Sequence, residues 1–172
     1  NRCRRQRQMC IRDRSLSLIA SNGSKAFYDG DITKKILNDF KENDGIFIKE
    51  DFLNYEIRKL EPLCGTYKSY KVCSMPPPSS GGIAIIQMLN ILENFDVKNF
   101  SHNSLEYIYL LKNIMGFAYA DRSVFLGDPD YFNVPVDELV SKDYAKRIAE
   151  KIKNKETTKI QPGMLIKESD ET

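Results

Sequence analysis

The chain has 172 residues, of which 41% are hydrophobic, and its 9 Phe and 9 Tyr argue against a disordered polypeptide. No apolar run approaches the ~20 residues that a membrane-spanning helix requires. The formal net charge is +2, and no apolar segment with a small-residue cleavage site follows the basic start, so we expect any export signal to lie outside this sequence.

Residues 1–14, NRCRRQRQMCIRDR, differ in composition from the rest of the chain. They hold six of the nine arginines, whereas all 17 lysines follow, beginning with Lys25. One interpretation is an arginine-rich arm for RNA or an acidic membrane. We adopt the other, an artefactual, non-native head, because MCIRDR resembles a translated sequencing-adapter remnant. Without its six Arg and one Asp the chain has a net charge of −3, which gives no reason to expect a nucleic-acid partner.

From Ser15 onward the sequence is typical of one folded piece of mixed α and β structure. Asp31 is a suitable N-cap for a helix. Asn43–Gly45 predicts a turn, and Lys49–Leu53 predicts one short helical turn. The helix after the N-cap is indicated by apolar residues at helical spacing, namely Ile32, Ile36, Leu37 and Phe40.

Residues Tyr55–Met75 are rich in β-forming residues and predict two strands that turn near Lys68–Ser69. That register places Cys64 opposite Cys73. A disulfide needs Cβ atoms only ~3.5–4.5 Å apart, closer than most facing pairs, so two free thiols are expected.

Too few metal-binding side chains are present for a zinc site. Cys3 and Cys10 belong to the head, His102 is the only histidine, and no C-x-x-C pair occurs. We expect neither a metal site nor a cofactor.

The stretch MPPPSSGG, Met75–Gly82, allows several interpretations. A phosphate loop is disfavoured because its glycines are adjacent and apolar residues follow. A serine nucleophile lacks both the G-x-S-x-G turn and a histidine partner. A flexible linker is disfavoured because three prolines stiffen the chain. We interpret the stretch as a rigid strand-to-helix connector, in which the serines offer N-cap oxygens and the glycines allow close backbone approach.

Three helices are predicted after the connector. Ile83–Leu92 is apolar nearly all round and indicates a buried helix that ends at Asn94–Val97. A second helix starts near Asn103–Ser104 and stops around Gly127–Pro129. Its apolar residues recur at three and four: Leu105, Ile108, Leu111, Ile114, Met115, Ala118 and Tyr119. Ser141 caps the third helix, whose buried stripe comprises Tyr144, Ala145, Ile148 and Ile152.

The connector and several other stretches resemble one protein family. SMPPPSSGGIAIIQMLNILENFD, AYADRSVFLGDPDYFNVPVDELVSKDYAKRI and the terminal ESDET are similar to segments of the γ-glutamyltranspeptidase (glutathione hydrolase) family. AFYDGDI, FLNYEIRKLEPLCGTYKSYKV, SHNSLEYI and GDPD also fall in the family's order. Each stretch alone is weak, but their shared order is specific. The resemblance extends from about Ser21 to Thr172.

Members of this family are made as a precursor that cleaves itself before a threonine, which then starts the small subunit as the catalytic nucleophile. Thr172 matches this nucleophile, and Glu168–Glu171 matches the end of the large subunit. The resemblance therefore implies an autoprocessing junction between Glu171 and Thr172. Residues 15–172 would be the C-terminal part of the large subunit plus one residue, with 154–171 a loop that leads to the junction.

The resemblance also implies the fold and the activity. The fold would be α+β: a fragment of the αββα sandwich of N-terminal-nucleophile hydrolases, mostly helices with a few strands. The enzyme would cleave glutathione and other γ-glutamyl amides through a threonine acyl-enzyme, and pass the glutamyl group to water, amino acids or peptides. A small subunit from the same precursor would complete it, and a periplasmic or extracellular location is expected.

No substrate-binding residue of the family falls in this segment, since the oxyanion glycines lie in the small subunit and the arginine for the α-carboxylate lies upstream of Ser15. Arg122 is expected to pair with an acid such as Asp121 or Asp128. The family commonly has E-A-x-[KR]-x-A-[YF]-A-D-R where Asn113–Arg122 stands here. The chain alone is expected to be inactive and poorly stable. The alternative function is a non-catalytic helical interaction domain or an inactive relative.

Overall fold

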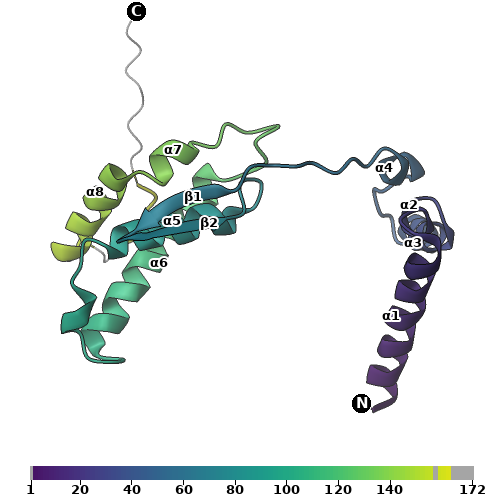
Figure 1. The fold of residues 1–172 in the computed structure, drawn as a ribbon, viewed down its shortest axis with the longest axis horizontal. Coiled ribbons are helices and arrows are strands. Elements are labelled where there is room, and N and C mark those ends of the chain that lie inside the picture. Colours follow the sequence, from purple (N-terminus) through teal and green to yellow (C-terminus); the bar gives the residue numbers. More distant parts are fainter. Residues whose placement is uncertain (1, 157–158, 164–172) are drawn as a thin grey trace, which may run out of the picture. The chain divides into compact units, whose positions relative to one another are not determined.

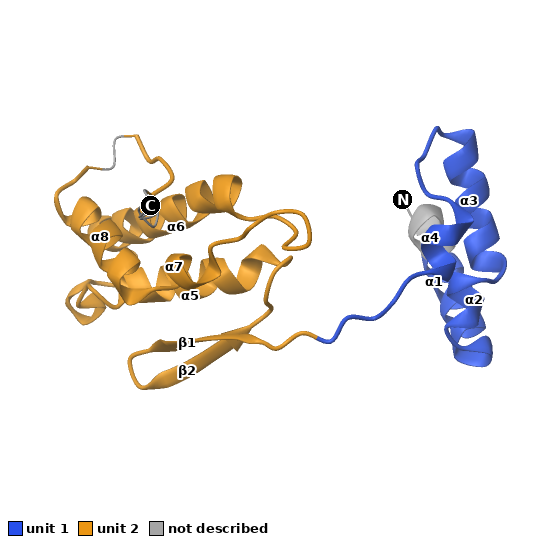
Figure 2. Ribbon diagram, turned by 90° about the horizontal axis from the view of Figure 1, so that it is seen from above, with its two compact units in different colours: residues 1–59 blue, residues 60–172 orange. Residues whose placement is uncertain are grey.

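The computed structural model describes residues 2–156 and 159–163, with side chains from Met9 onward. The chain divides into two compact units, residues 1–59 and 60–172 (Figure 2). The expectation of one folded piece from Ser15 onward therefore differs from the structure, which has a boundary near Lys59. Among the described residues, no helix combines the length and apolar character needed to cross a membrane.

The described residues of the first unit, 2–59, form the helices α1 (Arg2–Asn22), α2 (Lys25–Tyr28), α3 (Asp31–Glu42) and α4 (Lys49–Leu53). Helix α1 runs without a break through residue 14, where the basic head was predicted to end. The artefactual origin of that head stays a prediction. The predicted helix after Asp31 is confirmed, but its N-cap is Gly30 and Asp31 is the first helical residue. A carboxylate in that first turn lies near the positive end of the helix dipole, where its negative charge stabilises the helix.

Aromatic rings hold the first unit together. Phe27 meets Tyr28 and Phe52, and Phe47 meets Phe40 and Phe52, with ring centroids 5.0–6.2 Å apart. Thr33, only 2% exposed, donates its hydroxyl to the Phe27 carbonyl and so joins α3 to α2.

The second unit contains a β-hairpin and the helices that pack around the main hydrophobic core (Figure 1). Its elements are β1 (Leu63–Tyr67), β2 (Tyr70–Ser74), α5 (Ser80–Leu92), the short 3₁₀ helix η1 (Val97–Asn99), α6 (Leu105–Phe125), α7 (Val136–Leu139) and α8 (Lys142–Lys153). Helix α5 contacts both strands of the hairpin as well as α6, α7 and α8. It therefore lies between the hairpin on one side and α6 and α8 on the other (Figure 2).

The predicted hairpin register is confirmed. The antiparallel strands pair Cys64 with Cys73 and turn at Lys68–Ser69. The expectation of free thiols is wrong, because the two cysteines form a disulfide. Their Cα atoms are 4.1 Å apart, closer than the ~4.5 Å usual for a directly opposed pair without ladder hydrogen bonds. This close approach of the two strands brings the sulfur atoms within bonding distance.

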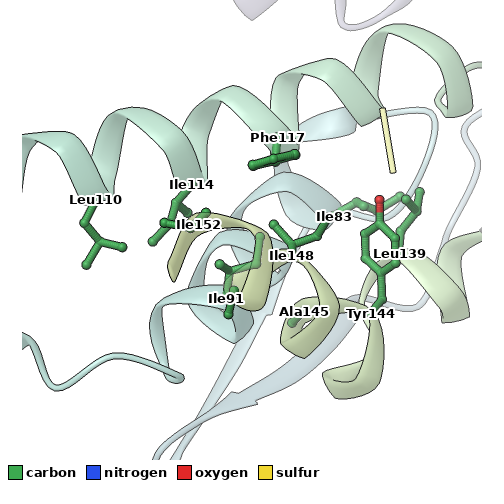
Figure 3. Close-up of a cluster of buried hydrophobic side chains, with 11 residues drawn as sticks. Ile83, Ile91, Leu110, Ile114, Phe117, Leu139, Tyr144, Ala145, Ile148 and Ile152 are labelled. Carbon is green, nitrogen blue, oxygen red and sulfur yellow. The ribbon is translucent and has the colours of Figure 1, made fainter. Parts of the chain in front are cut away.

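The hydrophobic core of the second unit forms where α5, α6, α7 and α8 meet (Figure 3). The predicted buried stripe of α8 is confirmed, since its four residues are each at most 4% exposed. The core is made of Ile83, Ile91, Leu110, Ile114, Phe117, Leu139, Tyr144, Ala145, Ile148, Ala149 and Ile152. The predicted buried character of α5 also holds, although Ile85 is 46% exposed.

Local capping accounts for two helix starts. Ser104 Oγ accepts a hydrogen bond from the Tyr107 amide, which agrees with the predicted helix start near Asn103–Ser104. Ser141 Oγ accepts one from the Tyr144 amide, so the predicted cap at Ser141 is confirmed. Helix α7 was not predicted. On α6 the exposed face carries apolar side chains, namely Leu105, Ile108, Met115 and Tyr119, which are 47–78% exposed.

Candidate functional site

The predicted nucleophile Thr172 and its neighbour Glu171 lie outside the described residues. The last described residue before them is Gly163, which precedes Thr172 by nine residues and is buried. Most of the predicted loop 154–171 is likewise outside the description, so that prediction stays open. The site can therefore be built from the side chains that hold Gly163.

A fully buried carboxylate binds this segment. Asp121, near the end of α6, is 0% exposed. Its Oδ1 accepts a hydrogen bond from the Gly163 amide at 2.7 Å. Its Oδ2 accepts one from the Tyr144 hydroxyl at 2.6 Å and one from Gln87 Nε2 at 2.5 Å. The carboxylate thus joins α5, α6 and α8 to the chain that leads towards the predicted junction.

These three donors explain why a carboxylate is tolerated in the core. A buried charge is costly unless hydrogen bonds replace its water. Burial, together with the adjoining Asp121 carboxylate, raises the pKa of Tyr144 far above its usual range. The phenol therefore stays protonated and acts as a donor. Figure 3 shows the Tyr144 ring reaching from α8 towards α6 with its hydroxyl leading.

Only glycine fits at position 163. A Cβ there would overlap the Tyr144 hydroxyl and come within 2.6 Å of the ring carbon that bears it. The backbone of Gly163 therefore lies directly against the side chain that also binds Asp121.

A second contact holds the same segment one turn earlier on α6. A Cβ at Gly116 would come within 2.5 Å of Ile160 Cδ1, and Ile160 packs against the core. Gly116 is one of the positions that depart from the common family pattern, which has Lys or Arg there. The structure gives this departure a physical role, because the missing side chain leaves room for Ile160.

The MPPPSSGG stretch connects β2 to α5, as predicted. It contains a cis peptide bond between Pro77 and Pro78. A Cβ on Gly82 would overlap the Met75 carbonyl oxygen, which confirms close backbone approach at this glycine. The predicted use of serine oxygens as caps is wrong. Ser79 occupies the N-cap position, but its hydroxyl oxygen accepts no capping hydrogen bond from the helix.

Ser80 instead accepts a hydrogen bond from Arg122 Nε at 2.9 Å. The expected pairing of Arg122 with Asp121 or Asp128 is therefore wrong. Asp121 faces the core, where its oxygens are occupied by Gln87, Tyr144 and Gly163.

A third polar contact fixes the hairpin to the helices. Glu93, just after α5, accepts hydrogen bonds from the Lys68 amide and from Lys142 Nζ, each at 2.5 Å. Lys142 Nζ also donates to the Thr66 carbonyl at 2.6 Å. The bond from Lys142, followed by that from the Lys68 amide, lowers the pKa of Glu93 below its usual value.

Within residues 2–156 and 159–163, no group of three His, Cys, Asp or Glu side chains could hold a metal ion. Sequence reasoning missed the buried network around Asp121. The available signal was polar residues inside apolar helices, because Gln87 stands between two pairs of apolar residues and Asp121 ends the run Phe117–Ala120.

Comparison with known proteins relates this arrangement to one enzyme family. The profile of the family described as Gamma-glutamyltranspeptidase matches residues 12–171. The chain is 46% identical over 155 residues to the Glutathione hydrolase proenzyme of Escherichia coli strain K12, covering 88% of this chain and 27% of that protein. It is 40% identical over 131 residues to the Acylase ACY 1 proenzyme of Pseudomonas sp. strain SE83, covering 76% of this chain and 24% of the acylase.

A solved structure agrees with these sequences. The crystal structure of Helicobacter pylori gamma-glutamyltranspeptidase superposes with a TM-score of 0.81 at 40% identity, covering 91% of this chain and 46% of the solved one. The expected fold class, a mostly helical α+β fragment of an N-terminal-nucleophile hydrolase, is therefore confirmed. The chain spans about a quarter of the length of the curated relatives that it matches.

Proposed function

The chain belongs to the gamma-glutamyltranspeptidase family, and we propose that it is the C-terminal part of the large subunit of a glutathione hydrolase proenzyme, together with the first residue of the small subunit. The observation that carries this proposal is its 46% identity to the Escherichia coli glutathione hydrolase proenzyme over 155 residues. Autocatalytic cleavage between Glu171 and Thr172 would release the small subunit with Thr172 at its start.

In the cleavage step, the Thr172 hydroxyl oxygen attacks the Glu171 carbonyl carbon. The carbon–nitrogen bond breaks, the proton passes to the Thr172 nitrogen, and an ester remains. Water then hydrolyses this ester to the Glu171 carboxylate and the free Thr172 hydroxyl. The freed α-amine can now act as the base for that hydroxyl. The precursor therefore acquires its nucleophile and its base in one event.

In the mature enzyme, Thr172 attacks the γ-glutamyl amide of glutathione or a related donor. The amine product leaves, and an acyl-enzyme remains. Water gives hydrolysis, whereas the amine of an amino acid or peptide gives transpeptidation. No metal or cofactor takes part in this scheme.

We assign the protein to an oxidising compartment, the periplasm or the extracellular space. The Cys64–Cys73 disulfide supports this assignment, because reducing systems in the cytosol keep most such pairs as thiols.

The proposal is tested first by the coding sequence after Thr172, which should continue with Thr-His-Phe or Thr-His-Tyr followed by Ser. The full proenzyme should then separate into two subunits, and Thr172→Ala should prevent this. Cleaved enzyme should release p-nitroaniline from γ-glutamyl-p-nitroanilide. A different continuation, or an intact and inactive proenzyme, would instead favour a non-catalytic helical interaction domain or an inactive relative.

A further inference from the structure

We propose that Gly116, Asp121 and Tyr144 form a docking track for residues 160–163, and that Asp121 is a positioning residue for cleavage before Thr172. The docking track is defined by these three residues, Gly116 and Asp121 on α6 and Tyr144 on α8. The inference rests on the proposed function, since it assigns to the track a part in that cleavage.

Two independent contacts place the segment on the track. Ile160 fills the space over Gly116, where a Cβ would come within 2.5 Å of its Cδ1. Three residues later, the Gly163 amide donates to Asp121 Oδ1 at 2.7 Å. The first contact is apolar and the second is a charge-assisted hydrogen bond, so together they fix both the position and the direction of the segment.

The spacing of these contacts agrees with an extended segment that runs along α6. Five helical residues from Gly116 to Asp121 advance about 7.5 Å at 1.5 Å per residue. Three extended residues from Ile160 to Gly163 can span up to about 10–11 Å. The segment therefore has enough reach to make both contacts while it runs in the same direction as α6, towards the helix C-terminus.

The Asp121 network couples the docked segment to the helical core. Gln87 and Tyr144 donate hydrogen bonds to Asp121 Oδ2, whereas the Gly163 amide donates one to Oδ1. Removal of the segment would leave part of a fully buried carboxylate without its donor, which is unfavourable. Folding of α5, α6 and α8 around Asp121 therefore favours the docked segment.

Docking limits where the junction can lie. Thr172 follows Gly163 by nine residues, which can reach at most about 30 Å when fully extended. Fixing one end of a short tether raises the effective concentration of its other end at any site within that reach. Cleavage requires the Thr172 hydroxyl oxygen to reach the Glu171 carbonyl carbon in a reactive geometry, and small misplacements of reacting groups cost large factors in rate.

The test uses the full proenzyme, including the sequence that follows Thr172, purified before cleavage is complete. Asp121→Ala removes the acceptor for the Gly163 amide and should slow the appearance of the two subunits by about 10–100-fold. Asp121→Asn keeps an oxygen that can accept this bond and should recover part of the rate. Asn90→Ala is the matched control. Asn90 is 2% exposed and bonds to the Val140 carbonyl, but it makes no bond to residues 160–163.

Cleavage is measured below the unfolding transition of every variant, with the thermal midpoint recorded for each. If Asp121→Ala slows cleavage and Asn90→Ala does not, at comparable loss of stability, the positioning role is supported. If both variants slow cleavage equally, or Asp121→Ala cleaves at the wild-type rate, the inference is overturned while the proposed function stands.

A variant on the segment itself covers the case in which Asp121→Ala fails to fold. Ile160→Ala removes the side chain that packs against Gly116 and changes no residue of the helices. It should also slow cleavage. An unchanged rate in Ile160→Ala would then overturn the inference. Failure of the proposed function looks different, because either the wild-type proenzyme stays uncleaved or Thr172→Ala is still cleaved.

Discussion

Two adjacent glycines at the start of α5 should respond in opposite ways to alanine. A Cβ on Gly82 would overlap the Met75 carbonyl oxygen and come within 3.1 Å of the carbonyl carbon. Both are backbone atoms next to β2, so no flexible side chain can move aside. A Cβ on Gly81 would meet nothing closer than Ser79 Oγ at 3.8 Å. Gly81→Ala therefore serves as the control for Gly82→Ala.

The two effects can be estimated separately. Alanine is favoured over glycine inside a helix by up to about 1 kcal/mol, and this gain applies to both variants. Overpacking at Gly82 adds a cost of about 1–3 kcal/mol or more, since the connector must shift. We expect Gly81→Ala to be neutral or slightly stabilising and Gly82→Ala to be destabilised by about 2 kcal/mol relative to it.

Thermal unfolding followed by circular dichroism measures the difference, in the 172-residue chain and in the full proenzyme. For a chain of this size about 2 kcal/mol corresponds to a shift of roughly 4–8 °C. Equal midpoints for the two variants would show that the connector can move freely, and the close approach at Gly82 would then have no energetic weight.

Three further outcomes follow from the same geometry. Cys64→Ser should cost about 2–3 kcal/mol, because it opens the short disulfide loop, and reduction of the wild-type chain should cause a similar loss in urea titrations. Glu93→Gln should lower the thermal midpoint at neutral pH; because the folded pKa of Glu93 is lowered, the wild-type advantage is present above pH 4.5 and disappears as the pH falls further. The purified 172-residue chain alone should not release p-nitroaniline from γ-glutamyl-p-nitroanilide, and measurable turnover would refute its dependence on the small subunit.

Features controlled by neighbouring residues were predictable from the sequence. The hairpin register followed from a turn at Lys68–Ser69 alone, since pairing in an antiparallel hairpin is symmetric about its turn. Ser141 was recognisable as a cap because a cap serine bonds to an amide only three residues ahead, and the helix start near Ser104 depends on a contact of the same short range. The N-cap of α3 was predicted one position too late, at Asp31. The actual N-cap, Gly30, has the extended backbone that precedes a helix, but it has no side chain by which a cap could be recognised in the sequence.

Features controlled by distant residues were not predictable. Asp121 meets its three donors across 34, 23 and 42 residues of sequence, and helical periodicity carries no information about such partners. The prediction of free thiols at Cys64 and Cys73 was wrong for a related reason. Register showed that Cys64 faces Cys73, but the sequence does not determine how closely the two strands approach.

The adjacent pair Asp121–Arg122 shows how one motif can serve two separate contacts. Successive helical residues point about 100° apart, so a buried position is followed by one that faces another surface. The Asp121 carboxylate therefore turns into the core and binds Gly163, while the Arg122 guanidinium stays exposed and binds Ser80 in the first turn of α5. In the family pattern the two residues appear together, as the final D-R. In the structure, each residue holds a different segment to α6, the chain before the proposed junction in one case and the MPPPSSGG connector in the other.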